Sequence, residues 1–434
     1  MTPTQLKKLE RELDEYIDWL TDGMGRSERR EALGLYLTGL LLDGERKSIE
    51  PLAARLVDDQ SEIESMRQRL QQCVSVSKWA EQEIFRRLAI KIDDELPEIE
   101  ALVIDDTGFP KKGEHSVGVT RQYSGTLGRI ENCQVASSLH LAGERGSACI
   151  GLRLYLPEEW ANDRRRCRQA NVPTDVHFQT KSEIAIDLLD AAIAAGVRSH
   201  IVLADSGYGD NREFRNAIRE RGFEYAVGVH HPTVVWRPGT KFEMPQQTGR
   251  QGHPFQNLRA VGGKTASIGE LARELNYRSV TWREGSRGKQ RSRFAAARVR
   301  TAHKHTQNGA PGPEEWLLCE WPTGEANPTK HYLVSLPANT PIRELVRIAK
   351  LRWRVERDYQ DLKNEVGLDH FEGRSWPGFH HHAALCAAAH AFLALRRALF
   401  PPEHDSMDAA DGAPAHPAAP ASSLAGVSAM PASV

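Results

Sequence analysis

The stretch ALVIDDTGFPKKG, residues 101–113, decides the fold, because an apolar run leads directly into two acidic residues and a turn. A short apolar run bounded by turn residues is typical of a buried β-strand. We therefore expect a strand that ends at Asp105 and Asp106. Buried carboxylates are costly unless a cation or hydrogen bonds neutralise them. The alternative is a plain turn whose Asp caps local backbone N–H groups.

A second stretch, HIVLADSGYG at residues 200–209, repeats this design. An apolar strand leads into Asp205, and a Gly-rich turn follows. Capping of the turn is again the alternative for the carboxylate. Two such strand ends in one sheet predict a shared site at its edge, because α/β folds bind ligands at the ends of their strands.

The segments around these two stretches alternate between strand and helix patterns. They read in chain order as three strands, a helix, a strand, a helix and a strand: ALVIDD, QVASSLHLA, IGLRLYLP, KSEIAIDLLDAAIAAG, HIVLAD, NREFRNAIRERG and EYAVGV. This is the order of the ribonuclease-H-like fold, an α/β fold in which helices flank a mixed sheet. We expect the helix that begins at Lys181 to end at Gly196.

The flanking regions complete the predicted domain organisation. Leu6, Leu9, Leu13, Tyr16, Ile17 and Leu20 form one apolar helix face, and Ser27 is a plausible N-cap for a second helix. We expect a helical, DNA-binding N-terminal domain, then the first part of the core, a β-rich basic insertion, the rest of the core with its catalytic helix, and a disordered Ala/Pro-rich tail. The corresponding ranges are 1–98, 99–229, 230–330, 331–400 and 401–434.

Composition narrows the class of protein. The 434 residues carry a formal net charge of −1, so a nucleic-acid partner has to be sought in local charge clusters. The six cysteines are scattered without a C-x-x-C pair, which argues against a zinc ribbon or a disulfide framework and fits a reducing cytosol. No apolar stretch is long enough to span a membrane. We expect a cytoplasmic protein, associated with the bacterial nucleoid.

The stretch IAKLRWRVERDYQDLKNEVGL, residues 348–368, supplies a third acidic position. We expect one long helix that starts near Thr340 or Pro341. Spacings of four and seven residues place Arg352, Glu356 and Lys363 on one face of that helix. The alternative is an ordinary Arg–Glu pair on a solvated helix face, which contributes only about 0.3–0.5 kcal/mol.

Carboxylates from two strands and a helix would form a metal site in which every ligand atom is oxygen. Such a site suits Mg²⁺, for which Mn²⁺ can substitute, better than zinc. Two ions about 4 Å apart can activate a water or a 3′-hydroxyl and stabilise the leaving oxygen of a phosphodiester. Arg352 and Lys363 would then bind flanking phosphates.

Together, IDDTGFPKKG with the following GVTRQYSGTLGRIENCQ, LADSGYG and the R-x3-E-x6-K spacing resemble the DDE-type transposases of bacterial insertion sequences, most closely the DDE superfamily endonucleases. The resemblance covers roughly residues 30–390. It implies a ribonuclease-H-like core, a β-rich insertion before Glu356, and Mg²⁺-dependent cleavage and strand transfer at terminal inverted repeats. It also implies that Asp105, Asp205 and Glu356 are the catalytic metal ligands.

The sequence departs from the family pattern at two places. Ala349 stands where the signature usually has Tyr, three residues before the Arg. The doubled acid leaves Asp106 as a possible alternative first carboxylate. The family pattern of Asp, any residue, then Thr or Ser favours Asp105.

Basic residues indicate where DNA would lie. TWREGSRGKQRSRFAAARVR, residues 281–300, predicts a hairpin whose basic side chains form a phosphate-binding ribbon, with a merely solvated hairpin as the alternative. Lys111, Lys112 and the RRRCR run at 164–168 would extend the same groove. The residues expected to bind phosphate are Arg352, Lys363, Lys111, Lys112, Arg287, Lys289, Arg291 and Arg293.

Two further features have less specific interpretations. Trp236 and Trp282 lie in the predicted insertion, where a Trp is more often part of a core than a stacking platform for an unpaired base. The HHH run at 380–382, with His390, lacks further ligands at suitable spacing. We interpret these histidines as polar surface or DNA-facing residues and not as a metal site.

The main hypothesis is therefore a cut-and-paste transposase. Its partners would be double-stranded DNA, as terminal inverted repeats and as target, and a second copy of the chain when DNA is bound. One alternative is a catalytically inactive, transposase-derived DNA-binding regulator, which the departure at Ala349 leaves open. Another is an α/β phosphohydrolase for a small molecule, against which the basic hairpin argues.

Overall fold

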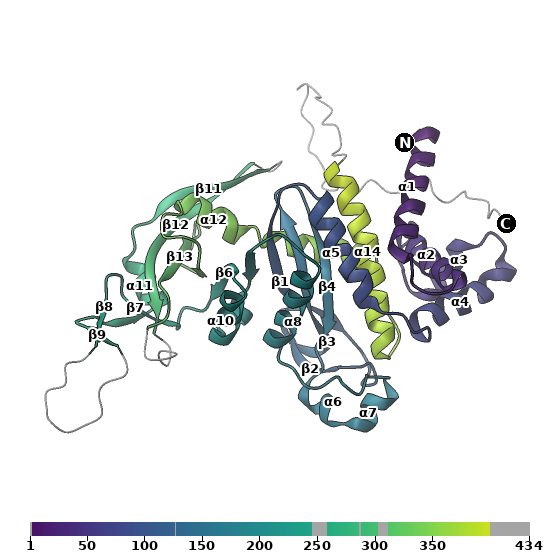
Figure 1. Cartoon of the computed structure of the whole chain (residues 1–434), viewed down its shortest axis with the longest axis horizontal. Helices are drawn as coiled ribbons and strands as arrows, with labels where there is room; N and C mark the ends of the chain where they lie inside the picture. Colours follow the sequence, from purple (N-terminus) through teal and green to yellow (C-terminus); the bar gives the residue numbers. More distant parts are fainter. Residues whose placement is uncertain (1, 126, 245–257, 286–287, 303–310, 400–434) are drawn as a thin grey trace. The chain divides into compact units, whose positions relative to one another are not determined.

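The computed structural model describes residues 2–125, 127–244, 258–285, 288–302 and 311–399, which form two compact units (Figure 1). Unit 1 comprises the described residues of Met1–Ile99, Asp106–Arg198 and Arg354–Val434. Unit 2 comprises those of Glu100–Asp105 and Ser199–Trp353. Strand β1 (Ile99–Pro110) and helix α13 (Trp353–Asn364) each pass from one unit to the other. The tail at 401–434 lies outside the described residues.

The N-terminal part of unit 1 is helical, as the apolar periodicity predicted. Its elements are α1 (Pro3–Thr21), α2 (Ser27–Leu41), α3 (Ile49–Leu56), the short η1 (Gln60–Glu62), α4 (Ile63–Ser75) and α5 (Glu81–Glu95). Leu9, Tyr16 and Leu20 are buried on the predicted face of α1. The expected cap of α2 is wrong by one residue, because Arg26 holds the N-cap position and Ser27 is already helical.

Helix α14 (Trp376–Leu399) runs through the middle of unit 1. It packs against β4 and α5 and also against α2 and α4, and Figure 1 shows it beside α5. The Tyr16 hydroxyl donates a hydrogen bond to the Ala388 carbonyl over 2.9 Å, so α1 also reaches this helix. A helix that neighbours surround is buried on all sides. The helical N-terminal segment is therefore part of the same compact unit as α14.

The sheet of unit 1 is built on β3 (Arg129–Gly143), which pairs antiparallel with both β2 (Thr120–Ser124) and β4 (Ser147–Leu154) and neighbours β1. The short α6 (Glu158–Asn162) and α7 (Arg164–Gln169) follow β4. Helix α8 (Lys181–Ala194) begins with a capping box formed by Thr180 and Glu183 and packs on β3 and β4. The helix is followed by Gly196, whose φ of +86° favours glycine. This left-handed residue accounts for the predicted end of the helix.

Unit 2 holds most of the remaining strands. Its elements are β5 (Ile201–Ala204), α9 (Ser206–Gly209), α10 (Arg212–Glu220), β6 (Glu224–Val229), β7 (Val234–Trp236), β8 (Lys241–Glu243), β9 (Arg259–Val261), β10 (Thr265–Ser267), α11 (Ile268–Glu274), β11 (Arg278–Gly285), β12 (Gly288–Thr301), β13 (Glu315–Trp321), β14 (Lys330–Val334) and α12 (Ile342–Lys350). Its main sheet has the order β10-β7-β12-β13-β14-β6-β5-β1, with β11 paired to β12. Strands β1, β5 and β6 run parallel, and β14 joins β6 antiparallel.

The strand order confirms the predicted ribonuclease-H-like α/β fold with a β-rich insertion. It is β4-β3-β1 in unit 1 and β1-β5-β6 in unit 2, with α8 between β4 and β5 and α10 between β5 and β6. One expectation is wrong: β1 does not end at Asp105 and Asp106 but continues to Pro110. Both carboxylates have charged partners, so they do not force the chain out of the sheet.

The structure also bears on disulfide bonds and on membrane-spanning helices, neither of which the sequence predicted. All six cysteines are buried with free thiols, as expected for a chain without a disulfide framework. Within the described ranges, the structure contains no helix with the length and apolar character needed to cross a bilayer.

Candidate active site

Asp105 and Asp205 occupy equivalent positions on neighbouring parallel strands of unit 2. The register pairs Leu102 with Val202 and Ile104 with Ala204, so the next residue on each strand is the aspartate. Adjacent strands lie about 4.8 Å apart, and residues at one level of the register face the same side. The two predicted strand-end carboxylates therefore stand side by side, on backbones held by the hydrogen bonds of the sheet.

Asp105 is only 9% exposed and forms an ion pair. Nη1 of Arg352 lies 2.5 Å from its Oδ2 atom, and both residues belong to unit 2. A buried carboxylate without a cation or hydrogen-bond donors would be strongly destabilising, and the guanidinium removes that penalty. Arg352, which we expected to bind phosphate, thus contacts a predicted metal ligand.

Asp106 faces the other side of β1, because side chains alternate along a strand. Its carboxylate accepts a hydrogen bond from the Ser137 hydroxyl over 2.9 Å and lies 2.8 Å from Nζ of Lys181. Both partners belong to unit 1. The two adjacent aspartates therefore have separate environments.

Asp205 also has a local structural role, as the capping alternative anticipated. It is the N-cap of α9, and its Oδ1 atom accepts a hydrogen bond from the Gly207 N–H over 2.9 Å. The following turn requires glycine at position 209, because a Cβ atom there would lie 1.9 Å from the Gly228 carbonyl oxygen. The Gly-rich sequence thus lets β6 approach the turn that carries Asp205.

The third motif does not lie on one continuous helix, which corrects the sequence expectation. Helix α12 ends at Lys350, α13 begins at Trp353, and Arg352 lies in the turn between them. No Pro or Gly marks the interruption in the sequence. Tertiary contacts accompany it, since Nζ of Lys350 lies 2.5 Å from Glu320 and Arg352 pairs with Asp105.

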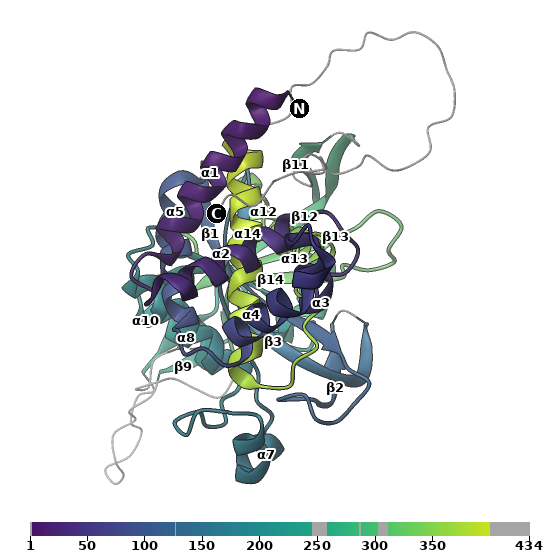
Figure 2. The same ribbon diagram turned by 90° about the vertical axis from the view of Figure 1, so that its right-hand side faces the viewer.

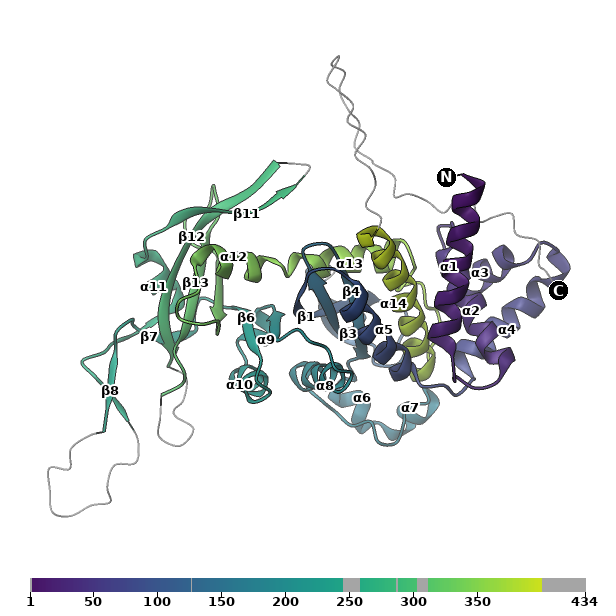
Figure 3. The ribbon, with the colours of Figure 1, turned by 45° about the horizontal axis from the view of Figure 1, so that its top comes forward.

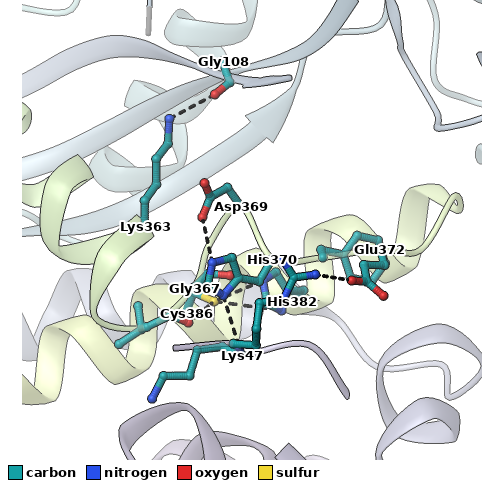
Figure 4. Close-up of polar contacts among 12 residues, drawn as sticks. Lys47, Gly108, Lys363, Gly367, Asp369, His370, Glu372, His382 and Cys386 are labelled. Carbon is teal, nitrogen blue, oxygen red and sulfur yellow. Dashed lines mark hydrogen bonds and ion pairs between the residues drawn. The ribbon is translucent and has the colours of Figure 1, made fainter. Parts of the chain in front are cut away.

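Glu356 and Lys363 share one face of α13, because seven residues at 100° each bring the helix back to within about 20°. Glu356 is exposed in the first turn of α13. Nζ of Lys363 donates a hydrogen bond to the Gly108 carbonyl over 3.0 Å (Figure 4). Burial lowers the pKa of Lys363 from its usual value. Glu356, Lys363 and Gly108 all belong to unit 1.

The opposite face of α13 is fixed by a buried polar network in unit 1. Asp358 accepts hydrogen bonds from the His140 ring over 2.7 Å and from the Ser147 hydroxyl over 2.6 Å. The other ring nitrogen of His140 lies 2.9 Å from the Ser138 hydroxyl, which in turn contacts Tyr359. Asp358 lies two residues after Glu356, about 200° around the helix, so its burial turns Glu356 outward. This network was not predicted, and its only local signal is the acidic residue two positions after Glu356.

The basic ribbon of unit 2 has the predicted hairpin form. β11 and β12 pair antiparallel from Arg278–Phe294 to Gly285–Gly288, and Figure 3 shows them as a long two-stranded ribbon. Lys289, Arg291 and Arg293 are exposed along β12. Arg287 lies outside the described residues.

The two tryptophans of the insertion pack against side chains of their own unit. The Trp236 ring meets Phe242 edge to face, and the Trp282 ring meets Phe294 in the same way. Nζ of Lys350 also lies 4.7 Å from the centre of the Trp282 ring. Both rings are half-buried, so these contacts hold them against their own unit outside its fully buried core.

Lys111 and Lys112 follow β1 in unit 1 and differ in exposure. Nζ of Lys111 donates a hydrogen bond to the Phe371 carbonyl over 2.9 Å, and burial lowers its pKa. Lys112 is exposed. Lys112 thus presents its charge to solvent, whereas Lys111 is half-buried.

The histidines of α14 are neither surface nor DNA-facing, which overturns the sequence interpretation. His380, His381, His382 and His390 are each at most 3% exposed. The His381 ring lies within hydrogen-bonding distance of the Val74 and Trp79 carbonyls, and the His382 ring contacts the Tyr36 hydroxyl. The N-terminal helices cover this side of α14, which the polar sequence of the run concealed.

No group of three or more His, Cys, Asp or Glu side chains within the described residues is arranged to hold a metal ion. In unit 2 the pair of Asp105 and Asp205 supplies carboxylate oxygens, the ligand type that Mg²⁺ and Mn²⁺ prefer. Glu356 belongs to unit 1.

Similarity to known proteins identifies the family of this chain. A family model of the DDE superfamily endonucleases matches residues 19–289, a range that contains Asp105 and Asp205 and ends before Glu356. The "Probable transposase for insertion sequence element IS701" of Microchaete diplosiphon is 25% identical over 374 residues, which cover 84% of this chain and 82% of that protein. Because the family match spans more than half of the chain, this protein belongs to the DDE superfamily endonucleases, the family that its three motifs resemble.

Proposed function

We propose that this endonuclease is a transposase that cleaves DNA at the ends of an insertion sequence and joins those ends to target DNA. The observation that carries the proposal is the parallel register that places Asp105 beside Asp205. A relative named as a transposase over most of both chains supports the same reading. Asp105, Asp205 and Glu356 are the proposed catalytic carboxylates.

The donor set fits Mg²⁺ as the cofactor, with Mn²⁺ as a substitute. Its ligand atoms are carboxylate oxygens, the ligand type that Mg²⁺ and Mn²⁺ prefer. Bound Mg²⁺ supplies activation of the attacking oxygen and stabilisation of the leaving oxygen of the phosphodiester. The carboxylates would hold the ions, and this chemistry would need no further acid or base from the protein.

Asp105 is the proposed first carboxylate, and Asp106 is proposed to be structural. Asp105 shares its register level with Asp205, whereas Asp106 is held on the opposite face by Ser137 and Lys181. This assignment agrees with the family pattern of Asp, any residue, then Thr or Ser.

The proposed DNA contacts come from basic side chains of both units. Arg352 and Lys363 would bind phosphates next to the cleaved bond, Arg352 through its bidentate fork and Lys363 as a point charge. Lys289, Arg291 and Arg293 on β12 would contact the backbone further away, with Lys111 and Lys112 in unit 1. The N-terminal helices are a further proposed DNA-binding region, and two copies of the chain would pair two DNA ends. Such a protein would work at the bacterial nucleoid.

Incubation of the full chain with labelled DNA that carries the ends flanking its gene tests the proposal. A transposase cuts at these ends with Mg²⁺ or Mn²⁺, not with EDTA, and produces a strand-transfer product when target DNA is added. Cleavage without transfer would leave an endonuclease and remove the transposase assignment. Binding without cleavage under either ion would instead favour the inactive regulator.

A further inference from the structure

The hairpin of β2 and the start of β3 has two unlike faces. The register pairs Thr120 with Cys133 and Tyr123 with Ile130. Because side chains alternate along a strand, Tyr123 and Ile130 share one face. Ser124 and Cys133 are fully buried, whereas Tyr123 and Ile130 are each 60% exposed. In Figure 2 the labelled strand β2 and its partner form a ribbon at the edge of unit 1.

The inner face of the hairpin packs against β1 at Gly108, the residue that Lys363 contacts. A Cβ atom at Gly108 would lie 2.5 Å from the Ser124 hydroxyl, so glycine allows the close approach of the hairpin to β1. The carbonyl of this same glycine accepts the hydrogen bond from Lys363. The hairpin is thus fixed next to a residue that we propose to bind phosphate at the cleavage site.

The outer face has an unusual amount of exposed apolar surface. Among the described residues, nine large hydrophobic side chains are exposed, and Tyr123, Leu127 and Ile130 lie together in this one hairpin. Single exposed hydrophobic residues are common, but clustered ones mark interaction sites. Tyrosine combines a flat apolar ring with a polar tip, which suits a partially wet interface.

One basic side chain lies on this apolar face, and another lies beside it. Arg121 is exposed on the same face as Tyr123, whereas Arg129, which the register pairs with Ser124, lies on the opposite face and forms an ion pair with Glu131 over 3.0 Å. The Asn132 amide donates to the Lys111 carbonyl over 2.7 Å, which holds the turn containing the exposed Lys112 beside the hairpin. An aromatic ring among positive charges matches a polyanion with flat rings, which is a nucleic acid.

We propose that the outer face of the β2–β3 hairpin binds an unpaired DNA end, with Tyr123 stacked on an exposed base. Ile130 packs against the same base, and Arg121 contacts the adjacent phosphate. Stacking on an aromatic ring tolerates any base, so this contact would recognise the open end and not its sequence. The inference rests on the proposed function, which would supply the cut DNA end that this face binds.

The test uses a short duplex with an unpaired 3′ overhang that contains 2-aminopurine, whose fluorescence falls when the base stacks. We expect the full-length wild type to quench this probe. Tyr123→Ala should lose the quenching and bind about 10-fold more weakly, whereas Tyr123→Phe should retain both properties because its ring still stacks. Ile193→Ala is the matched control, since Ile193 is another exposed apolar residue of unit 1, 38% exposed, and its helix α8 has no proposed DNA contact. Equal thermal melting of all variants confirms that each one folds.

The outcomes separate this inference from the proposed function. If wild type does not quench the probe, or if Tyr123→Ala quenches and binds as wild type does, the stacking role is wrong. If Tyr123→Ala changes only the oligomeric state, the face is an interface between copies and the inference also fails. Quenching that depends on Tyr123 in a protein that never cuts DNA would support the DNA contact and overturn the proposed catalysis.

Discussion

Asp105 and Asp205 stand on neighbouring strands of unit 2, whereas Glu356 stands on helix α13 in unit 1. Backbone hydrogen bonds between β1 and β5 determine where the two aspartates lie. Side-chain packing determines how α13 is turned, because the buried Asp358 contacts His140 and Ser147. The comparison teaches that strand-borne groups can be located from local sequence, whereas a helix-borne group depends on partners far away in the chain.

The largest expected effect on stability comes from breaking the network beneath α13. Asp358→Ala leaves His140 buried without its carboxylate, so we expect a loss of about 3–5 kcal/mol in the free energy of unfolding. Glu356→Ala, on the exposed face of the same helix, is the matched control and should change stability little. Chemical denaturation measures both. Equal losses from the two variants would remove the distinction between the two faces.

The pH dependence of the unfolding free energy tests the contribution of His140 to the same network. Burial disfavours its charged form, but Cys149 and then Asp358 favour it more, which raises the pKa of His140 from 6.5 to about 10. A raised pKa in the folded state contributes stability that is complete below the unfolded pKa and is lost as pH rises through the folded one. The stability difference between wild type and His140→Gln should therefore shrink from pH 6.5 to about 10. A difference that grows over this range would contradict the protonated histidine.

Features set by local sequence were predictable, whereas features set by distant contacts were not. Asp205 was predictable because an apolar run before an acid and glycines signals a strand end, and the register with β1 follows from the fold. The break between α12 and α13 was not predictable, since no Pro or Gly marks it and the contacts of Lys350 and Arg352 lie far away in sequence. The buried His380–His382 run was misread because distant helices supply hydrogen-bond partners for its rings, such as the Val74 carbonyl for His381 and the Tyr36 hydroxyl for His382.

A smaller effect, on DNA affinity, is expected from the exposed charges of the basic ribbon. Replacing Lys289, Arg291 and Arg293 with Ala should weaken DNA binding and reduce the salt dependence of the affinity. If each side chain contacts one phosphate, the slope of log affinity against log salt should fall by about 3. Fluorescence anisotropy across a salt series measures this slope. An unchanged slope would show that this ribbon is only solvated.

The most direct test of the central claim compares cleavage by Asp105→Asn and Asp106→Asn, with Asp205→Asn and Glu356→Gln as further variants. We predict that Asp105→Asn, Asp205→Asn and Glu356→Gln still bind DNA but cut it on the order of 1000-fold more slowly, because metal ions supply several kcal/mol to this chemistry. Asp106→Asn should continue to cut, with a lower melting temperature from the loss of its pair with Lys181. An inactive Asp106→Asn beside an active Asp105→Asn would contradict the account, as would full activity in all four variants.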